Sequence, residues 1–267
     1  MTILTLTDFS APADNALAYA AQLAGPMQAR LVLLHVRRTS LLDPEAFTGK
    51  YPKRTEAEAA ALLQERVAQF TGQGIECSGQ LVAGGVTDQL VAAAEAFQAQ
   101  LVVASKCNTE DVPDELVDST VLSLLRHTPC PLLVVPEAYQ RHELPRQWLV
   151  ATDEQPAHLG ALAPAVQALL AGSHPVVHAV QVAVPGDSAA ADASLATALG
   201  ATGPVQVEHG SDVAAALAGF AGQQPGSWLV LWARAHSRLS SLFHHSTTAA
   251  AVLHSSVPVL VLPEIAG

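Results

Sequence analysis

Cys130-Pro-Leu-Leu-Val-Val-Pro-Glu137 returns later in the sequence as Val257-Pro-Val-Leu-Val-Leu-Pro-Glu264. Each run is short and apolar, as expected for a strand buried in a parallel sheet. Each is followed by Pro-Glu. A second pair of echoes lies upstream, where Ser119-Thr120 matches Ser246-Thr247 at the same offset of 127 residues. An internal repeat of this length predicts that one structural unit occurs twice in the chain.

A third echo sets the length of the repeat. Leu4-Thr-Leu-Thr-Asp8 matches Leu149-Val-Ala-Thr-Asp153 at an offset of 145 residues, so the second copy is 18 residues shorter in its interior. We therefore predict two domains, at residues 1–140 and 147–267, with a polar connection between them.

The first copy is predicted to alternate strands and helices. Helix starts are indicated by Ser10 with Pro12, and by the capping box formed by Thr55 and Glu58. Gly84 and Gly85 indicate a turn before a helix headed by Thr87. The predicted strands are Ile3–Thr7, Leu31–Val36, Glu76–Val82, Leu101–Ala104 and Leu132–Val135. This order predicts an α/β fold, a doubly wound parallel sheet flanked by helices.

The second copy is predicted to repeat this path with one weak element. Ala189–Leu199 is rich in alanine and has little apolar stripe, and most of the missing residues fall here. Pro164 predicts that the preceding helix kinks or starts late. The other predicted elements are Trp148–Thr152, Leu159–Leu170, Val176–Val182, Val205–Glu208, Val213–Phe220, Leu229–Trp232, Thr247–Leu253 and Val259–Leu262.

Composition excludes several classes of protein. Half of the 267 residues are apolar and 14% are charged, which suits a buried core. The net charge of −11 disfavours broad attachment to nucleic acid or to anionic lipid. No run is long and apolar enough to span a membrane, and the first residues do not resemble a signal peptide. The three cysteines fit no disulfide or zinc pattern, so we expect a cytoplasmic protein.

Taken together, these features resemble a tandem universal stress protein, with one domain in each half. The resemblance rests on the Thr-Asp ending of the first strand, on the second strand ending in Val36, and on Arg126-His-Thr-Pro-Cys-Pro-Leu-Leu-Val-Val135. It implies two five-stranded parallel sheets paired through their last strands. Here that pairing would be intramolecular, between Leu132–Val135 and Val259–Leu262, and would cover an apolar sheet edge.

The resemblance also implies a place for a nucleotide base in each half. In family members that bind ATP, an aspartate ending the first strand and a valine ending the second hold the adenine. The matching residues are Asp8 with Val36, and Asp153 with Val180. The loop at Gly84 would lie near the ribose. The alternative is that these are helix-entry and core residues, since an aspartate near a helix start is favourable without any ligand.

The phosphate loop of the first half departs from the family pattern. ATP-binding relatives have Gly-x2-Gly-x9-Gly-Ser/Thr, where this chain has Ser105-x2-Asn108-x9-Asp118-Ser119. The hydroxyls of Ser119 and Thr120 remain, but five acidic residues surround the single cation Lys106. Carboxylates beside a triphosphate are repulsive, so we expect no conventional magnesium–ATP site here.

The second half lacks the glycines too, but its charge is opposite. The loop has Ala233-x2-His236-x8-His245-Ser246, followed by Thr247. Arg234 and Arg238 are the only Lys or Arg residues from residue 147 to the end, and both lie in this loop. Cations at a helix start suit an anion, so this loop is the better candidate for a nucleotide or another anion, with ordinary surface arginines as the alternative.

Three hypotheses follow. The leading one is a non-enzymatic stress-response protein with degenerate nucleotide loops and anion or nucleotide binding in the second half. The alternatives are an ATP-binding switch or slow ATPase with one site per domain, and an interaction scaffold without ligand. We assign no catalytic residue and no metal site. The cofactor is unknown, with ATP or another nucleotide open; nucleic acid and membrane are not expected partners, and a homodimer is left open.

Overall fold

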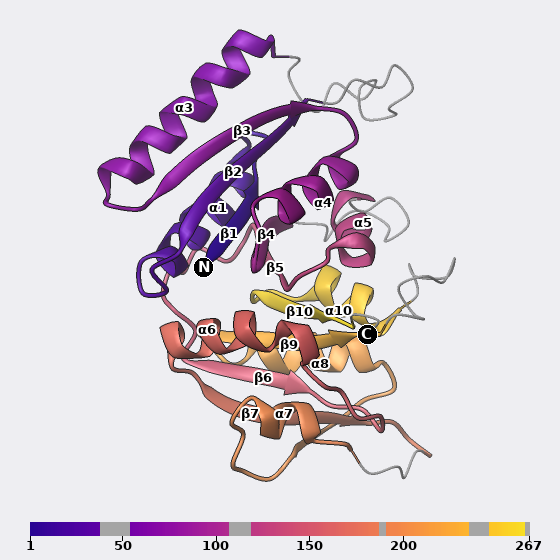
Figure 1. The fold of residues 1–267 in the computed structure, drawn as a ribbon. Helices are drawn as coiled ribbons and strands as arrows, with labels where there is room; N and C mark the ends of the chain where they lie inside the picture. Colours follow the sequence, from indigo (N-terminus) through magenta and orange to yellow (C-terminus); the bar gives the residue numbers. More distant parts are fainter. Residues whose placement is uncertain (38–53, 107–118, 187–190, 235–245, 265–267) are drawn as a thin grey trace.

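The computed structural model describes residues 1–37, 54–106, 119–186, 191–234 and 246–264. One ten-stranded sheet runs through the molecule in the order β3-β2-β1-β4-β5-β10-β9-β6-β7-β8 (Figure 1). The two halves of this order have the same topology, read outward from the middle. The strands are β1 Thr2–Leu6, β2 Arg30–Arg37, β3 Cys77–Ala83, β4 Leu101–Lys106, β5 Leu132–Pro136, β6 Gln147–Ala151, β7 Val176–Ala183, β8 Gln206–His209, β9 Ser227–Ala233 and β10 Val259–Pro263.

Helices flank this sheet in both units (Figure 1). The chain moves outward from β1 through β2 to β3, then crosses back to β4 and continues to β5. Because the crossovers are right-handed, this reversal places α1 and α3 on one face of the first sheet and α4 and α5 on the other. The described helices are α1 Ala11–Ala24, α3 Glu56–Gly72, α4 Val86–Ala96, α5 Ser119–His127, the 3₁₀ turn η2 Gly160–Leu162, α6 Ala163–Ser173, α7 Ser194–Ala198, α8 Val213–Gly222 and α10 Thr247–His254. The doubly wound α/β fold expected from the sequence is confirmed.

The two units meet through their last strands, as predicted. β5 and β10 pair in antiparallel register, with Val134 opposite Val259 and Leu132 opposite Val261. The other strand pairings are parallel. Both β5 and β10 are buried along their whole length, so each unit covers the apolar edge of the other.

Most predicted helix starts are confirmed by their caps. Ser10 caps α1, and Thr55 and Glu58 form the predicted capping box of α3. Pro164 lies in the first turn of α6, which starts late as expected. The start of α4 was predicted wrongly in one detail. Gly85 is its N-cap, whereas the Thr87 hydroxyl lies 2.8 Å from the hydroxyl of Ser123 in α5.

The outer strands of the two units are covered differently. The 17-residue helix α3 packs on β2 and β3, and Arg66 of α3 forms a two-point ion pair with Asp14 of α1. The second unit has the five-residue helix α7 instead, which packs on β6 and β7. The shorter interior of the second copy therefore removes helix rather than strand.

Aromatic side chains fill the core where the two units meet. The indole N–H of Trp228 donates a 2.7 Å hydrogen bond to the hydroxyl of Tyr19, which lies in the other unit. Trp228 also stacks on Trp148, with ring centroids 5.6 Å apart, and all three side chains are fully buried. This cluster makes the two units share one continuous core.

The segment that connects the units is held by α1. The amide nitrogen of Asn15 donates to the carbonyl oxygens of Pro136 and Tyr139, at 3.3 and 3.1 Å. Its amide oxygen lies 2.9 Å from Nε2 of His142, so this ring nitrogen is the donor. Asn15 is thus fully used in fixing the path of the chain out of β5.

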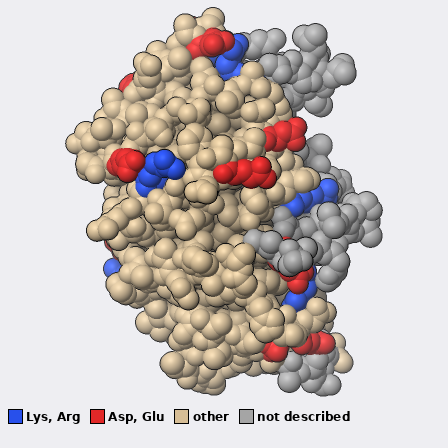
Figure 2. Space-filling model, viewed as in Figure 1, with Lys and Arg blue, Asp and Glu red and all other residues tan. Residues whose placement is uncertain are grey.

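Few charged side chains interrupt the face shown in Figure 2. Those that appear there are scattered, with wide uncharged areas between them, as the 14% charged composition implies. Among the described residues, no helix is long and apolar enough to cross a membrane.

Candidate functional site

The strand order marks one candidate site in each unit. In the first, β1 lies between β2 and β4, and in the second, β6 lies between β7 and β9. Open parallel sheets bind ligands beyond the carboxyl ends of strands, where the winding direction reverses. Asp8 and Asp153 follow β1 and β6 at these two points.

In the first unit, Asp8 organises the entry to α1. Its Oδ1 accepts a 2.9 Å hydrogen bond from the backbone N–H of Ser10, the N-cap residue. Its own carbonyl oxygen accepts from Arg54, which lies just before α3. Asp8 therefore has a local structural role that needs no ligand.

Next to Asp8, three side chains form a stack that the sequence did not indicate. Phe9 lies 4.4 Å from the ring of His35, centroid to centroid, and the guanidinium of Arg54 lies 5.3 Å from the Phe9 ring centre. Phe9 has a φ of +62°, which is uncommon outside glycine. His35 is buried, with Nδ1 2.7 Å from the Thr7 carbonyl oxygen, and burial lowers the pKa of its imidazole.

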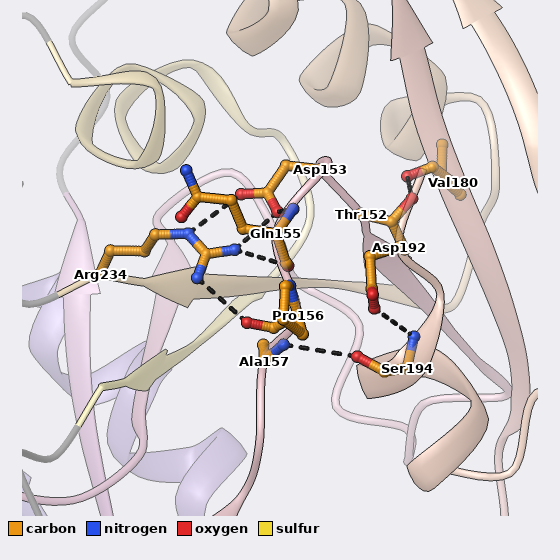
Figure 3. Close-up of polar contacts among 9 residues, drawn as sticks. All are labelled: Thr152, Asp153, Gln155, Pro156, Ala157, Val180, Asp192, Ser194 and Arg234. Atoms are coloured by element: carbon orange, nitrogen blue, oxygen red, sulfur yellow. Dashed lines mark hydrogen bonds and ion pairs between the residues drawn. The ribbon is translucent and has the colours of Figure 1, made fainter. Parts of the chain in front are cut away.

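In the second unit, the aspartate is held by an arginine (Figure 3). Arg234 follows β9, and its Nη2 and Nε lie 2.6 and 3.2 Å from the two carboxylate oxygens of Asp153. The guanidinium also donates to the carbonyl oxygens of Gln155 and Pro156, at 2.8 and 3.3 Å. Asp153 accepts a further bond from the backbone N–H of Gln155. The arginine thereby ties the end of β9 to the chain that leaves β6.

A second aspartate is bonded to the backbone of Asp153. The backbone N–H of Asp192 donates to the carbonyl oxygen of Asp153. The Asp192 carboxylate accepts from the backbone N–H of Ser194 (Figure 3). Bonds to the side chain and backbone of Ser194 lower the pKa of the Asp192 carboxyl, with smaller contributions from His158 and Arg234. Within the described ranges, no three His, Cys, Asp or Glu residues are placed to hold a metal ion.

The strand register refines one predicted equivalence. The backbone N–H of Thr7 bonds to the Leu34 carbonyl oxygen, and that of Thr152 to the carbonyl oxygen of Val180. Val180 is therefore the counterpart of Leu34 and is fully buried. The residue that matches the half-buried Val36 is Val182, two positions further along β7.

The remaining candidate residues are spread around the two strand edges. Gly84 has a φ of +142°, and its N–H donates to the Arg37 carbonyl oxygen. Ser105 lies half-buried in β4, and α5 starts at Ser119, followed by the half-buried Thr120. Ser246 caps α10 through its hydroxyl, and Thr247 is exposed. Outside the described residues lie Asn108, His236, Arg238 and His245.

Lys106 reaches from the end of β4 in the first unit to the second unit. Its ammonium group is buried and donates to the carbonyl oxygens of Leu253 and Ser255, at the end of α10 in the second unit. Sequence reasoning counted Lys106 as the one cation beside the acidic loop. No sequence signal could have found its true partners, because they lie about 150 residues away and in the other unit.

Comparison with known proteins identifies the fold and the family. The model of the universal stress protein family matches residues 1–136, which is half of the chain. The chain belongs to the universal stress protein family. No curated protein matches the sequence.

Solved structures extend the likeness to both units. A universal stress protein from Archaeoglobus fulgidus superposes with a TM-score of 0.74 at 18% identity, covering 98% of both chains. A protein of unknown function from Pseudomonas aeruginosa superposes with a TM-score of 0.67 at 18% identity, covering 98% of this chain and 92% of the other. At this identity the likeness shows that the second unit has the same fold, although the family model matches only the first.

Proposed function

We propose that this universal stress protein is a non-enzymatic stress-response protein that binds an anion, such as a nucleotide phosphate, in its second unit. The proposal rests on one observation. Arg234 lies at the carboxyl end of β9, beside the end of β6, and its guanidinium is hydrogen-bonded to Asp153. This is the edge at which open α/β sheets bind ligands. An arginine fork matches the geometry of a phosphate as well as that of a carboxylate.

The partner of Arg234 can be exchanged at low cost. The Arg234 side chain is 13% exposed, but that of Asp153 is 61% exposed. Ion pairs with an exposed partner contribute about 0–1 kcal/mol. A phosphate can therefore replace Asp153 on the guanidinium while the bonds from Arg234 to the two backbone carbonyl oxygens keep the arginine in place.

The first unit supports the same proposal by contrast. The sequence of its strand-end loop has five acidic residues and one cation, Lys106, whose ammonium group donates to two carbonyl oxygens of the second unit. An acidic loop disfavours a triphosphate unless metal ions bridge the charges. The degenerate loop of the first unit is thus not proposed as an ATP site.

Calorimetric titration with ATP, with and without Mg²⁺, tests the proposal. Arg234→Gln should weaken ATP binding at least tenfold, because a charge-assisted contact of about 1.5–3 kcal/mol is lost. Asp153→Asn should tighten binding by about two- to fivefold, since it removes the competitor for Arg234. Asp8→Asn, the matched change in the first unit, should leave the affinity unchanged.

The sign of the Asp153→Asn effect separates the proposal from the alternatives. If Asp153 instead holds an adenine, as its counterparts do in ATP-binding relatives, Asp153→Asn weakens binding. Tight ATP binding that depends on Asp8, or steady ATP hydrolysis by the wild type, would overturn the proposal in favour of a switch or slow ATPase. Absence of any anion binding would favour a scaffold.

A further inference from the structure

The side chain of Lys106 joins the two units, and it does so with an ammonium group that is buried. Lys106 is the last residue of β4 and is 5% exposed. Its Nζ lies 2.8 Å from the carbonyl oxygen of Ser255 and 2.5 Å from that of Leu253. A buried ammonium group is unfavourable unless it is hydrogen-bonded, and both of these acceptors belong to the other unit.

The acceptors are the carbonyl groups that the end of a helix leaves unsatisfied. α10 ends at His254 with Ser255 as its C-cap, so Leu253 lies in its last turn. The end of a helix carries partial negative charge, and a cation there is favourable. Lys106 therefore completes and stabilises α10 from outside the unit to which α10 belongs.

The arrangement is one-sided. Strand register places Pro136 beside Lys106 and the equivalent Pro263 beside Ala233, so the second unit has alanine where the first has Lys106. The matching helix of the first unit, α5, uses side chains of its own. The hydroxyl of Thr128 donates to the carbonyl oxygen of Leu124. Nδ1 of His127 lies 2.8 Å from the carbonyl oxygen of Ser123.

We propose that Lys106 is a latch: a side chain of the first unit that holds the C-terminal end of α10 and thereby keeps this helix of the second unit ordered. α10 is an eight-residue helix whose other end is capped by Ser246. A change in the position of Lys106 thus reaches the N-terminus of α10 within about two helical turns. Because such a coupling is reciprocal, the order of α10 and the position of Lys106 depend on each other.

The consequence for ligand binding rests on the function proposed above. Ser246 and Thr247 begin α10 and belong to the candidate anion site of the second unit. Loosening α10 at its C-terminal end should therefore weaken the binding of an anion at its N-terminal end.

Hydrogen–deuterium exchange on the full chain tests the latch without any ligand. Lys106→Met, which keeps the length and removes the donors, should speed exchange of the α10 amides at least tenfold. Arg30→Met is the matched control, because Arg30 is a cation of the first unit that donates to Thr2 and Phe97 of that same unit. It should leave the exchange of α10 within twofold of the wild type.

Lys106→Gln, which retains a neutral donor, should give exchange rates between those of the wild type and Lys106→Met, and it is measured alone should Lys106→Met not fold. Ser246→Ala, which removes the cap at the other end of α10, sets the scale of full loosening. Unchanged α10 exchange in both Lys106 variants, or an equal effect of Arg30→Met on α10, overturns the latch. ATP titration is a separate readout that distinguishes the latch from the proposed function. If Lys106→Met speeds exchange of α10 but Arg234→Gln does not change ATP affinity, the latch is retained and the proposed function is rejected.

Discussion

The two units place an aspartate at the same strand end, and the two aspartates share one contact and differ in another. Asp8 and Asp153 each accept a 2.9 Å hydrogen bond from the backbone N–H two residues further on. This short turn is a local preference of aspartate and explains both residues without a ligand. Of these two aspartates, Asp153 alone has a guanidinium on its carboxylate within the part of the chain that the structure describes. Arg234, and not the repeated aspartate, therefore distinguishes the second site from the first.

A second contrast concerns the outer face of each half-sheet. In the first unit, α3 lies so close to β3 that a Cβ on Gly79 would come within 2.9 Å of Leu63. In the second unit, no helix of this length covers β8 among the described residues, and Val207 is 49% exposed. The two copies thus keep the strands that build the shared sheet and differ in what packs outside it.

The largest effect on stability is expected where the two units share their core. Trp228→Leu introduces the residue type that stands at the equivalent position of β4, Leu101. It removes the stacking on Trp148 and the bond to Tyr19, and should lower the free energy of unfolding by about 3 kcal/mol. Urea unfolding followed by circular dichroism measures the change.

A matched pair of variants isolates the hydrogen bond across the units. Trp228→Phe and Trp148→Phe remove similar indole volume, but the Trp148 indole N–H has no hydrogen-bond partner among the described residues. Trp228→Phe should therefore cost about 1 kcal/mol more than Trp148→Phe. Equal losses would mean that the bond between Trp228 and Tyr19 contributes nothing to joining the units.

A smaller effect is expected from exchanging the outer packing of the units. The strand registers make Val205 the counterpart of Gly79, so Gly79→Val imports the side chain of the second unit into the first. It should destabilise the protein by about 2 kcal/mol, because the new methyl groups clash with Leu63 and Val67 of α3. Val207→Thr on the uncovered strand should change stability by less than about 0.5 kcal/mol. If urea unfolding shows that Gly79→Val changes stability as little as Val207→Thr does, then α3 does not pack closely against Gly79.

Much of this fold could be predicted because its signals are local. Apolar runs such as Leu132–Val135 and the Thr55–Glu58 capping box each depend on neighbouring residues, and the structure confirms them. The candidate sites were less accessible. The pairing of Arg234 with Asp153 spans 81 residues, and the stack of Phe9 on His35 depends on a positive φ that no local pattern indicates. Long-range side-chain contacts are set by packing, not by periodicity.

A further expected effect is a pH dependence that arises from one side chain of the first unit, His35. His35 is buried against Phe9 and burial lowers its pKa, whereas its counterpart Gln181 cannot titrate. In the unfolded chain the imidazole binds its proton at the ordinary pKa of 6.5, so below that pH the unfolded state holds more protons than the folded state. The contribution of neutral His35 to the free energy of unfolding is therefore fully present above the unfolded pKa. It decreases as the pH falls below that value, until the pKa of the folded state is reached.

Replacing the histidine by the residue of the second unit makes this contrast measurable. His35→Gln should flatten the stability profile between pH 7 and pH 5, where one titrating group contributes at most about 1.4 kcal/mol per pH unit. The charged groups that act on His35 are Asp8, Arg54 and Arg37, and Asp8 opposes the downward shift while the two arginines reinforce it. Arg54→Met should therefore reduce the slope without removing it. Urea midpoints of the wild type and both variants across this range provide the measurement. An identical slope in His35→Gln would assign the acid sensitivity to other groups and leave the buried imidazole without a role in it.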